Sequence, residues 1–224
     1  MATYKCAGDK AILIEFDYKI SEEINERVRR LDIAINQHLV DSIIETVPAY
    51  HSILVYYNPL LVDSKELISK LKSLEESKSE DEIPEPRQLD IPVVYGGEFG
   101  PDLKYVADHN NLTPEEVIKK HTSGRYRVYM LGFTPGFAYL GGLSDQLAAP
   151  RHNNPRGKIP AGSVGIAGSQ TGIYPITSPG GWRIIGRTPL ELFKPDSDQP
   201  FLFKQGDIVN FKKIDKADYQ KIKK

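Results

Sequence analysis

The sequence predicts an α+β protein of two domains, an α/β domain at 1–88 and a β-barrel domain at 89–224. The first observation behind this prediction is that seventeen of the eighteen glycines follow Tyr95. Glycine reaches positive φ at little cost, so a glycine-poor part favours regular helices and strands, whereas a rich part favours tight turns and bulges. The second observation is a series of short β-forming runs after residue 125, separated by Gly and Pro, as is typical of a closed or nearly closed barrel.

Strands and helices alternate in the N-terminal part. The predicted order is strand 10–16, helix 21–40, two β-rich runs at 41–50 and 51–58, a helix from Asp63, and a strand at 89–94. The first helix has Ser21 as N-cap and an apolar stripe with helical spacing. If 89–94 is the last strand, the order is β-α-β-β-α-β, which is the ferredoxin-like split βαβ. An acidic stretch at 72–90, with two prolines, is the predicted hinge.

The C-terminal part opens with two short predicted helices, around 101–110 and 113–121. Thr113, Pro114 and Glu116 form a capping box with proline at the first helical position, which fixes the start of the second helix. A strand is predicted at 125–133. Further short strands are expected at 138–140, 162–168, 172–176, 181–186, 190–193 and 207–214.

Composition and motifs exclude several function classes. A net charge of −1 gives no global attraction to nucleic acid or an anionic membrane, so neither is an expected partner. The single cysteine, Cys6, fits a reducing compartment, and no apolar run is long enough to span a membrane, so a cytoplasmic location is expected. No phosphate-binding loop is present, and the five histidines lack metal-ligand spacing, so neither a nucleotide nor a metal site is predicted in this chain.

An apolar segment at 132–143 has two interpretations. Its aromatic residues alternate with Gly and Pro, which suits either a strand and turn in the barrel core or an exposed loop for a partner protein. Aromatic side chains beside rigid prolines bind a partner at low ordering cost. The candidate partner-binding residues are Phe133, Pro135, Phe137 and Tyr139.

A basic loop and a glycine-rich stretch follow each other between 150 and 182. Arg151, His152, Arg156 and Lys158 lie within eight residues, which indicates either a solvated turn or a site for a carboxylate or phosphate. The stretch 162–182 combines turn-forming glycines with hydroxyl and amide side chains and Trp182, a composition that suits recognition of a small amide-bearing molecule as well as barrel corners. His121, at a helix end, is a candidate general base or a structural histidine.

Four segments carry a family resemblance: GGEFGPDL (96–103), the stretch from His121 to Leu143, PRHNNPRGKIPAGSVGIAG (150–168) and QTGIYPITSPGGWRIIGRTPLELF (170–193). They resemble the family of the 5-oxoprolinase B subunit, allophanate hydrolase subunit 1 and the KipI-type inhibitor of a sporulation histidine kinase. The resemblance implies a ferredoxin-like domain followed by a cyclophilin-like barrel. It also implies a complex with a homologue of the 5-oxoprolinase C subunit and with a separate A subunit, which opens 5-oxoproline to glutamate with ATP hydrolysis.

On this resemblance the chain is expected to be inactive alone and to bind no cofactor, with ATP used through a partner protein of the complex. His121 would then handle a proton, and Arg151 and Arg156 would hold a carboxylate. The cleft would be lined by Gln170, Thr171, Tyr174, Ser178, Pro179, Gly180, Gly181 and Trp182.

Two other functions stay open at this point. One is a regulator that binds a sensor histidine kinase through the apolar segment 132–143. The other is a subunit that hydrolyses allophanate or a urea-derived amide. The resemblance by itself does not choose among these functions, because one fold supports many.

Overall fold

The computed structural model describes residues 2–19, 21–77 and 84–223, and it divides the chain into two compact units, Met1–Glu85 and Pro86–Lys224. The middle of the predicted hinge, residues 78–83, lies outside the described residues. The first unit contains β1 (Thr3–Cys6), β2 (Ala11–Glu15), α1 (Glu22–His38), β3 (Ile43–Pro48), β4 (Ser52–Tyr57) and α2 (Ser64–Glu76).

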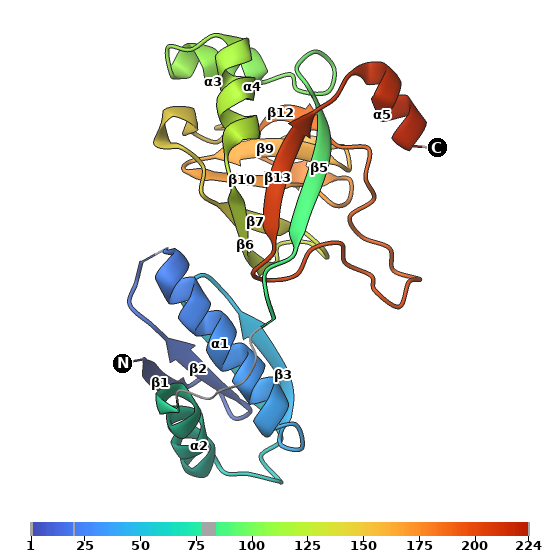
Figure 1. Cartoon of the computed structure of the whole chain (residues 1–224). Coiled ribbons are helices and arrows are strands. Elements are labelled where there is room, and N and C mark those ends of the chain that lie inside the picture. Colours follow the sequence, from blue (N-terminus) through green and yellow to red (C-terminus); the bar gives the residue numbers. More distant parts are fainter. Residues whose placement is uncertain (1, 20, 78–83, 224) are drawn as a thin grey trace. The chain divides into compact units, whose positions relative to one another are not determined.

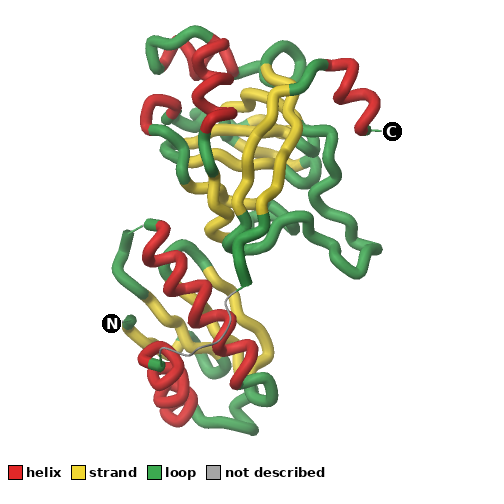
Figure 2. Tube along the Cα trace, viewed as in Figure 1, coloured by secondary structure: helices red, strands yellow, loops and turns green. Residues whose placement is uncertain are grey.

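The first unit is an antiparallel sheet in the order β1-β2-β4-β3, with α1 and α2 covering one face (Figure 2). Alternate residues of β2 and β4 point at the helices, and they form one core with the apolar stripe of α1. This core contains Ile12, Ile14, Ile53 and Val55 of the sheet, Ile24, Val28, Leu31 and Ile35 of α1, and Leu67 and Leu71 of α2. Ser21 accepts the Ile24 amide at 3.3 Å, so the predicted N-cap is confirmed.

The order of elements in the first unit differs from the prediction. The strand expected to complete a β-α-β-β-α-β order is β5 (Gln88–Tyr95), which pairs with barrel strands instead. The observed order is β-β-α-β-β-α, because β1 forms a hairpin with β2 and takes the edge of the sheet. Strands β2 and β3 flank β4, as in a split βαβ arrangement. A short strand of Thr, Tyr, Lys and Cys carries little apolar alternation, which is why the sequence did not reveal β1.

Seven described strands close into a barrel in the order β10-β7-β6-β13-β5-β12-β9. They are β5, β6 (Tyr126–Leu131), β7 (Ala138–Gly141), β9 (Ser163–Ala167), β10 (Gln170–Ile173), β12 (Arg183–Arg187) and β13 (Ile208–Lys213). The pair β13–β5 is parallel and the other described pairs are antiparallel. The barrel that the sequence predicted is therefore confirmed.

Helices α3 (Leu103–His109), α4 (Pro114–Ser123) and α5 (Lys216–Ile222) lie toward one end of the barrel (Figure 1). The start of α4 is as predicted, since Thr113 accepts the Glu116 amide at 3.2 Å and the Glu116 carboxylate accepts the Thr113 amide at 2.7 Å. No helix among the described residues has the length and apolar character needed to cross a bilayer.

Some elements of the barrel unit were not predicted. They are β8 (Arg156–Ile159), β11 (Ser178–Gly180), the 3-10 turn Asp145–Leu147 and α5. Strands β8 and β11 are rich in Gly, Pro and charge, so no local β preference marks them. The strand expected at 190–193 is absent from the described structure, where an isolated bridge joins Phe193 and Phe201.

Candidate functional site

The basic loop and the glycine-rich stretch meet in space. Strand β8 pairs with β11, so Arg156 lies opposite Gly180, and the His152 amide donates to the Gly181 carbonyl at 2.7 Å. Only glycine fits at position 180 without displacing its neighbours, because a Cβ there would come within 2.8 Å of Ile159 Cδ1 and within 2.9 Å of the Tyr174 ring. Two segments that the sequence singled out separately thus form one surface.

Aromatic side chains support this surface. The Phe137 ring makes edge contacts with Tyr174, Trp182 and Tyr139 at centroid distances of 5.2, 5.4 and 4.9 Å. Arg151 is exposed and its guanidinium lies 5.9 Å from the Trp182 ring centre. Within the described residues Arg151 has no hydrogen bond or ion pair, so its five donors are available to an anion.

Arg156, in contrast, is already paired with a carboxylate. Its two Nη atoms donate to the Asp102 oxygens at 2.7 and 2.8 Å, a bidentate pair that raises the pKa of Arg156. Burial raises the pKa of Asp102, but hydrogen bonds from Arg156, from the Ile184 amide and from His152 outweigh it and hold that pKa below its usual value. Arg156 is therefore paired within the protein, whereas Arg151 is an exposed arginine without such a partner among the described residues.

Three further side chains complete this cluster: His152 of the predicted basic loop, and Asp102 and Arg183, which the sequence analysis did not single out. His152 lies between Asp102, 3.2 Å from its Nε2, and Arg183, 2.9 Å from its Nδ1. Arg183 also stacks on Tyr105 with its guanidinium 3.6 Å from the ring centre. His152 had a signal, because it stands in the predicted basic loop, but Asp102 has the local sequence of an ordinary helix cap.

His121 lies in the barrel core rather than on this surface. It is fully buried, its ring lies 4.4 Å from that of Phe211, and burial lowers its pKa to about 3. The Tyr95 hydroxyl lies 2.8 Å from Nδ1, Nε2 lies 3.0 Å from the Thr171 hydroxyl, and Thr171 donates to the Gly165 carbonyl at 3.0 Å. Both ring nitrogens have hydrogen-bond partners and the ring is neutral. For His121 to transfer a proton, the barrel would have to open so that substrate reaches the ring, which is 0% exposed in this structure.

The other predicted cleft residues divide by exposure. Pro179 is exposed, and Gln170, Gly180 and Gly181 are half-buried, whereas Thr171, Tyr174, Ser178 and Trp182 are buried. Desolvation raises the pKa of Tyr174 to about 12, which keeps its hydroxyl protonated at neutral pH. The Ser178 hydroxyl is buried without a hydrogen-bond partner among the described residues. The accessible part of the predicted site is thus Arg151 with Pro179, Gly180 and Gly181, and we call this surface the rim.

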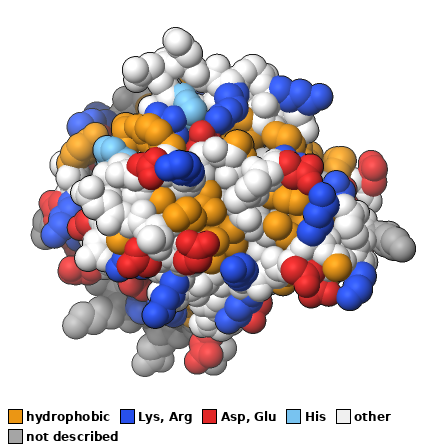
Figure 3. Space-filling model, turned by 90° about the horizontal axis from the view of Figure 1, so that it is seen from above, with side chains coloured by type: hydrophobic (Ala, Val, Ile, Leu, Met, Phe, Trp, Pro, Cys, Tyr) orange, Lys and Arg blue, Asp and Glu red, His pale blue; other side chains and the backbone are white. Residues whose placement is uncertain are grey.

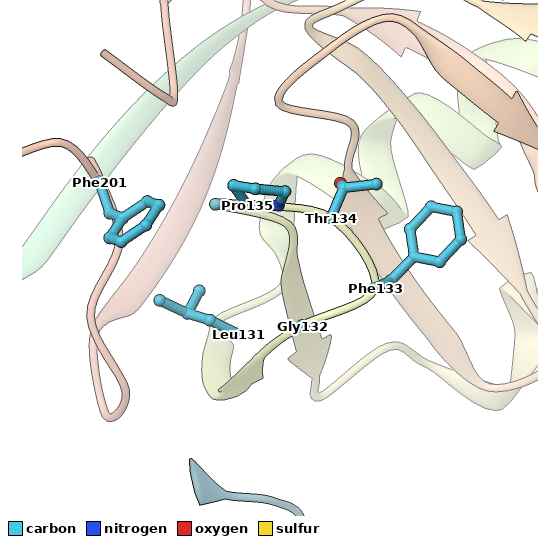
Figure 4. A pocket seen from close by; sticks show the side chains of 7 residues that line it. Leu131, Gly132, Phe133, Thr134, Pro135 and Phe201 are labelled. Atoms are coloured by element: carbon cyan, nitrogen blue, oxygen red, sulfur yellow. The ribbon is translucent and has the colours of Figure 1, made fainter. Parts of the chain in front are cut away.

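The predicted partner-binding segment is exposed at its tip. Phe133 is 62% exposed and has a φ of +67°, a conformation that costs a bulky residue about 1 kcal/mol. Pro135 is also exposed, Tyr139 is half-buried and Phe137 is buried, so the Phe137 ring supports the segment from beneath. Figure 4 shows the Phe133 ring pointing away from Leu131, Pro135 and Phe201, which line a hollow of about 330 Å³.

Other surface features lie outside this rim. One hollow of about 490 Å³ is bounded by Gly162, Thr177, Thr188 and Tyr219, among others. Acidic and basic side chains are interspersed on the face shown in Figure 3. Among the described residues no group of three or more His, Cys, Asp or Glu side chains is placed to hold a metal ion.

The fold and the rim define a class of protein, an α+β chain whose closed barrel presents the exposed guanidinium of Arg151 on an aromatic support. Such a surface suits a small molecule with a carboxylate. The chain belongs to the carboxyltransferase domain, subdomain C and D family, which matches residues 2–203.

Individual relatives agree with this family. The 5-oxoprolinase B subunit of Bacillus subtilis (strain 168) is 49% identical over 227 residues, which cover 96% of this chain and 94% of that protein. The crystal structure of TTHA0988 matches with a TM-score of 0.81 and 36% identity over 92% of this chain, which spans 40% of that chain. Kluyveromyces lactis urea carboxylase matches with a TM-score of 0.75 over 98% of this chain and 22% of that chain, and at 23% identity it shows the fold alone.

Proposed function

We propose that this chain is the B subunit of a 5-oxoprolinase, which opens 5-oxoproline to glutamate with ATP hydrolysis together with the A and C subunits. The observation that carries the proposal is the 49% identity with a 5-oxoprolinase B subunit over nearly the whole of both chains. The proposal includes a cytoplasmic location, ATP bound by a partner, and no activity of the isolated chain. It also includes the finer fold descriptions, ferredoxin-like for the first unit, with β1 at the sheet edge, and cyclophilin-like for the barrel.

The chemistry of the rim supports a role in substrate binding. 5-Oxoproline carries a carboxylate beside its lactam, and Arg151 is an exposed guanidinium without an internal partner in the described structure. A bidentate contact to that carboxylate would orient the lactam for attack by groups of a partner protein. Gly181 lies beside Arg151, since a Cβ built on it would be 3.9 Å from the Arg151 Cβ. Gln170, Pro179 and Gly180, the other predicted cleft residues that are not buried, are assigned with it to the contact with the rest of the molecule.

The exposed tip of the apolar segment supports a partner contact. A strained backbone at an exposed aromatic residue persists where the rest of the structure imposes it, and such strain gathers at functional sites. We therefore assign Phe133 and Pro135 to the contact with the homologue of the C subunit, with Tyr139 at its border.

The test is reconstitution with the A and C subunits of a 5-oxoprolinase, with glutamate measured from 5-oxoproline and ATP. Arg151→Ala is expected to raise KM at least tenfold, since a hydrogen bond to a charged group contributes about 1.5–3 kcal/mol. Lys158→Ala is the matched control, an exposed cation of the neighbouring strand β8, and should leave KM unchanged. Absence of glutamate from the wild-type complex would refute the proposal, and equal KM values for both variants would remove Arg151 from the site.

The same reconstituted complex tests the roles of the other two predicted catalytic residues, His121 and Arg156. His121→Gln, compared at equal folded concentration, loses kcat if the ring transfers a proton and keeps it if the ring serves the core. For Arg156, direct substrate binding predicts that Arg156→Lys raises KM even when Arg151 is absent. Binding of the isolated chain to a sensor kinase, with no glutamate formed in the complex, would favour the regulatory alternative.

A further inference from the structure

Asp102 stands where a helix cap is expected, yet it does not act as one. It precedes α3, but its carboxylate accepts no hydrogen bond from the first turn of that helix. An uncapped start forgoes about 1 kcal/mol. The two oxygens instead accept the Ile184 amide at 2.7 Å and the fork of Arg156, while His152 lies 3.2 Å away. Asp102 is only 5% exposed, so its carboxylate binds the residues next to the rim rather than solvent or the helix.

His152, a partner of Asp102, and Arg183, which contacts His152, hold the backbone on the two sides of Arg151. Arg151 lies on a loop without regular structure, so its neighbours determine its place. On one side, Arg183 Nε donates to the Pro150 carbonyl at 3.0 Å. On the other side, the His152 amide is bonded to Gly181, and the His152 ring lies between Asp102 and Arg183. The backbone on each side of Arg151 is thus tied to a network whose single carboxylate, among the residues described, is Asp102.

We propose that Asp102 is a positioning residue, which fixes the basic loop so that Arg151 presents its guanidinium to the substrate carboxylate. This inference rests on the proposed function for the identity of the substrate. Without the Asp102 charge, Arg156 loses its ion-pair partner, and the single oxygen of an asparagine cannot accept from Arg156, the Ile184 amide and His152 together. Arg151 then keeps its charge but must be ordered when substrate binds, and ordering a loop residue reduces affinity about tenfold.

A matched pair of substitutions tests the proposal. Asp102→Asn is compared with Asp207→Asn, because Asp207 is also buried, is also paired with one arginine, Arg87, and also accepts a backbone amide, from Lys204. In the reconstituted complex, Asp102→Asn is expected to raise KM for 5-oxoproline about five- to tenfold with kcat nearly unchanged. Asp207→Asn is expected to lower thermal stability without raising KM.

A double substitution shows whether Asp102 acts through Arg151. In an Arg151→Ala background, Asp102→Asn should add no further rise in KM, since the group that it positions is gone. Additive effects would overturn the proposal, as would an unchanged KM in folded Asp102→Asn. If Asp102→Asn does not fold, His152→Gln replaces it, because this ring, 20% exposed, lies outside the hydrophobic cores and its loss should raise KM in the same non-additive way.

A second readout does not depend on activity. Trp182 is the one tryptophan of the chain and lies beneath Arg151, so acrylamide quenching of its fluorescence reports the state of the loop. We expect the quenching constant to rise about twofold in Asp102→Asn and to stay unchanged in Asp207→Asn. If the wild-type complex forms no glutamate, the proposed function fails, and equal quenching in the two variants would separately refute the positioning role.

Discussion

Replacement of His121 by glutamine is predicted to remove a large part of the loss in free energy of unfolding that the barrel unit suffers when the pH falls. His121 is fully buried, and burial lowers its pKa from 6.5 to about 3. The folded protein therefore holds the neutral ring, while the unfolded chain takes up a proton once the pH falls below 6.5. Stability from this residue is fully present above pH 6.5 and is lost as the pH falls toward 3.

The size of the effect follows from the difference between the two pKa values. Each pH unit between them lowers the free energy of unfolding by about 1.4 kcal/mol, so the loss near pH 5 is about 2 kcal/mol. Glutamine does not titrate and can still bond to one of Tyr95 and Thr171. We expect His121→Gln to cost about 2 kcal/mol at neutral pH through imperfect hydrogen bonds and to lack this pH term.

The assay is urea unfolding at pH 7.5 and at pH 5, followed by the fluorescence of Trp182. This residue lies in the barrel unit, so the signal reports that unit separately from the first one. Asp102, whose pKa is below its usual value, also destabilises the protein in acid, but it does so in both proteins and cancels in the comparison. The wild type should lose about 2 kcal/mol more than His121→Gln between the two pH values.

Equal losses in wild type and variant would refute this reasoning. They would mean that the ring is protonated in the folded protein or is reached by water. Either result would reopen His121 as a group that exchanges protons with a ligand.

Three further predictions concern single positions. Gly180→Ala should destabilise the barrel unit by about 2 kcal/mol and shift the Trp182 emission, because the new methyl group displaces the Tyr174 ring; an unchanged melting temperature would contradict this. Thr113→Ala should lower the free energy of unfolding by about 1 kcal/mol through loss of the α4 cap, and Thr113→Ser should restore most of it in the same urea assay. Phe133→Gly should leave stability within about 0.5 kcal/mol, because relief of the positive φ offsets the greater freedom of glycine, yet it should weaken binding to the C-type partner at least tenfold in a titration.

Features with a local cause were predictable from the sequence. The Thr113 and Glu116 box marks the start of α4, and the helical spacing of apolar residues marks α1 and its buried face. The glycine distribution indicated a barrel because tight turns and close approaches, such as that of Gly180 to Tyr174, require glycine wherever they occur. The basic loop and the glycine-rich stretch were each singled out from their composition, but the pairing of β8 with β11 that joins them was not predicted.

Features set by distant partners were not predictable. The predicted boundary at 88/89 put strand 89–94 with the barrel, whereas the conditional β-α-β-β-α-β order put it in the first unit. Its β preference fits either unit, and its pairing with β13, more than a hundred residues away, decides where it belongs. Asp102 looks like a cap because its local sequence fits one, whereas Arg156 and Ile184, which redirect its carboxylate, are far along the chain. The burial of His121 likewise depends on Phe211 and Thr171, which no spacing near the histidine reveals.

The parallel pairing of β5 with β13 has a consequence for synthesis. Strand β13 sits between β5 and β6, so a seam stays open until residues 208–213 have left the ribosome. During translation the nascent chain therefore exposes the unpaired edges of two apolar strands, which other chains can join. Cells that make this protein at high rates should therefore depend on chaperones that hold unfolded chains. A chain ended by a stop codon just before β13 should aggregate into inclusion bodies to a greater extent than the full chain.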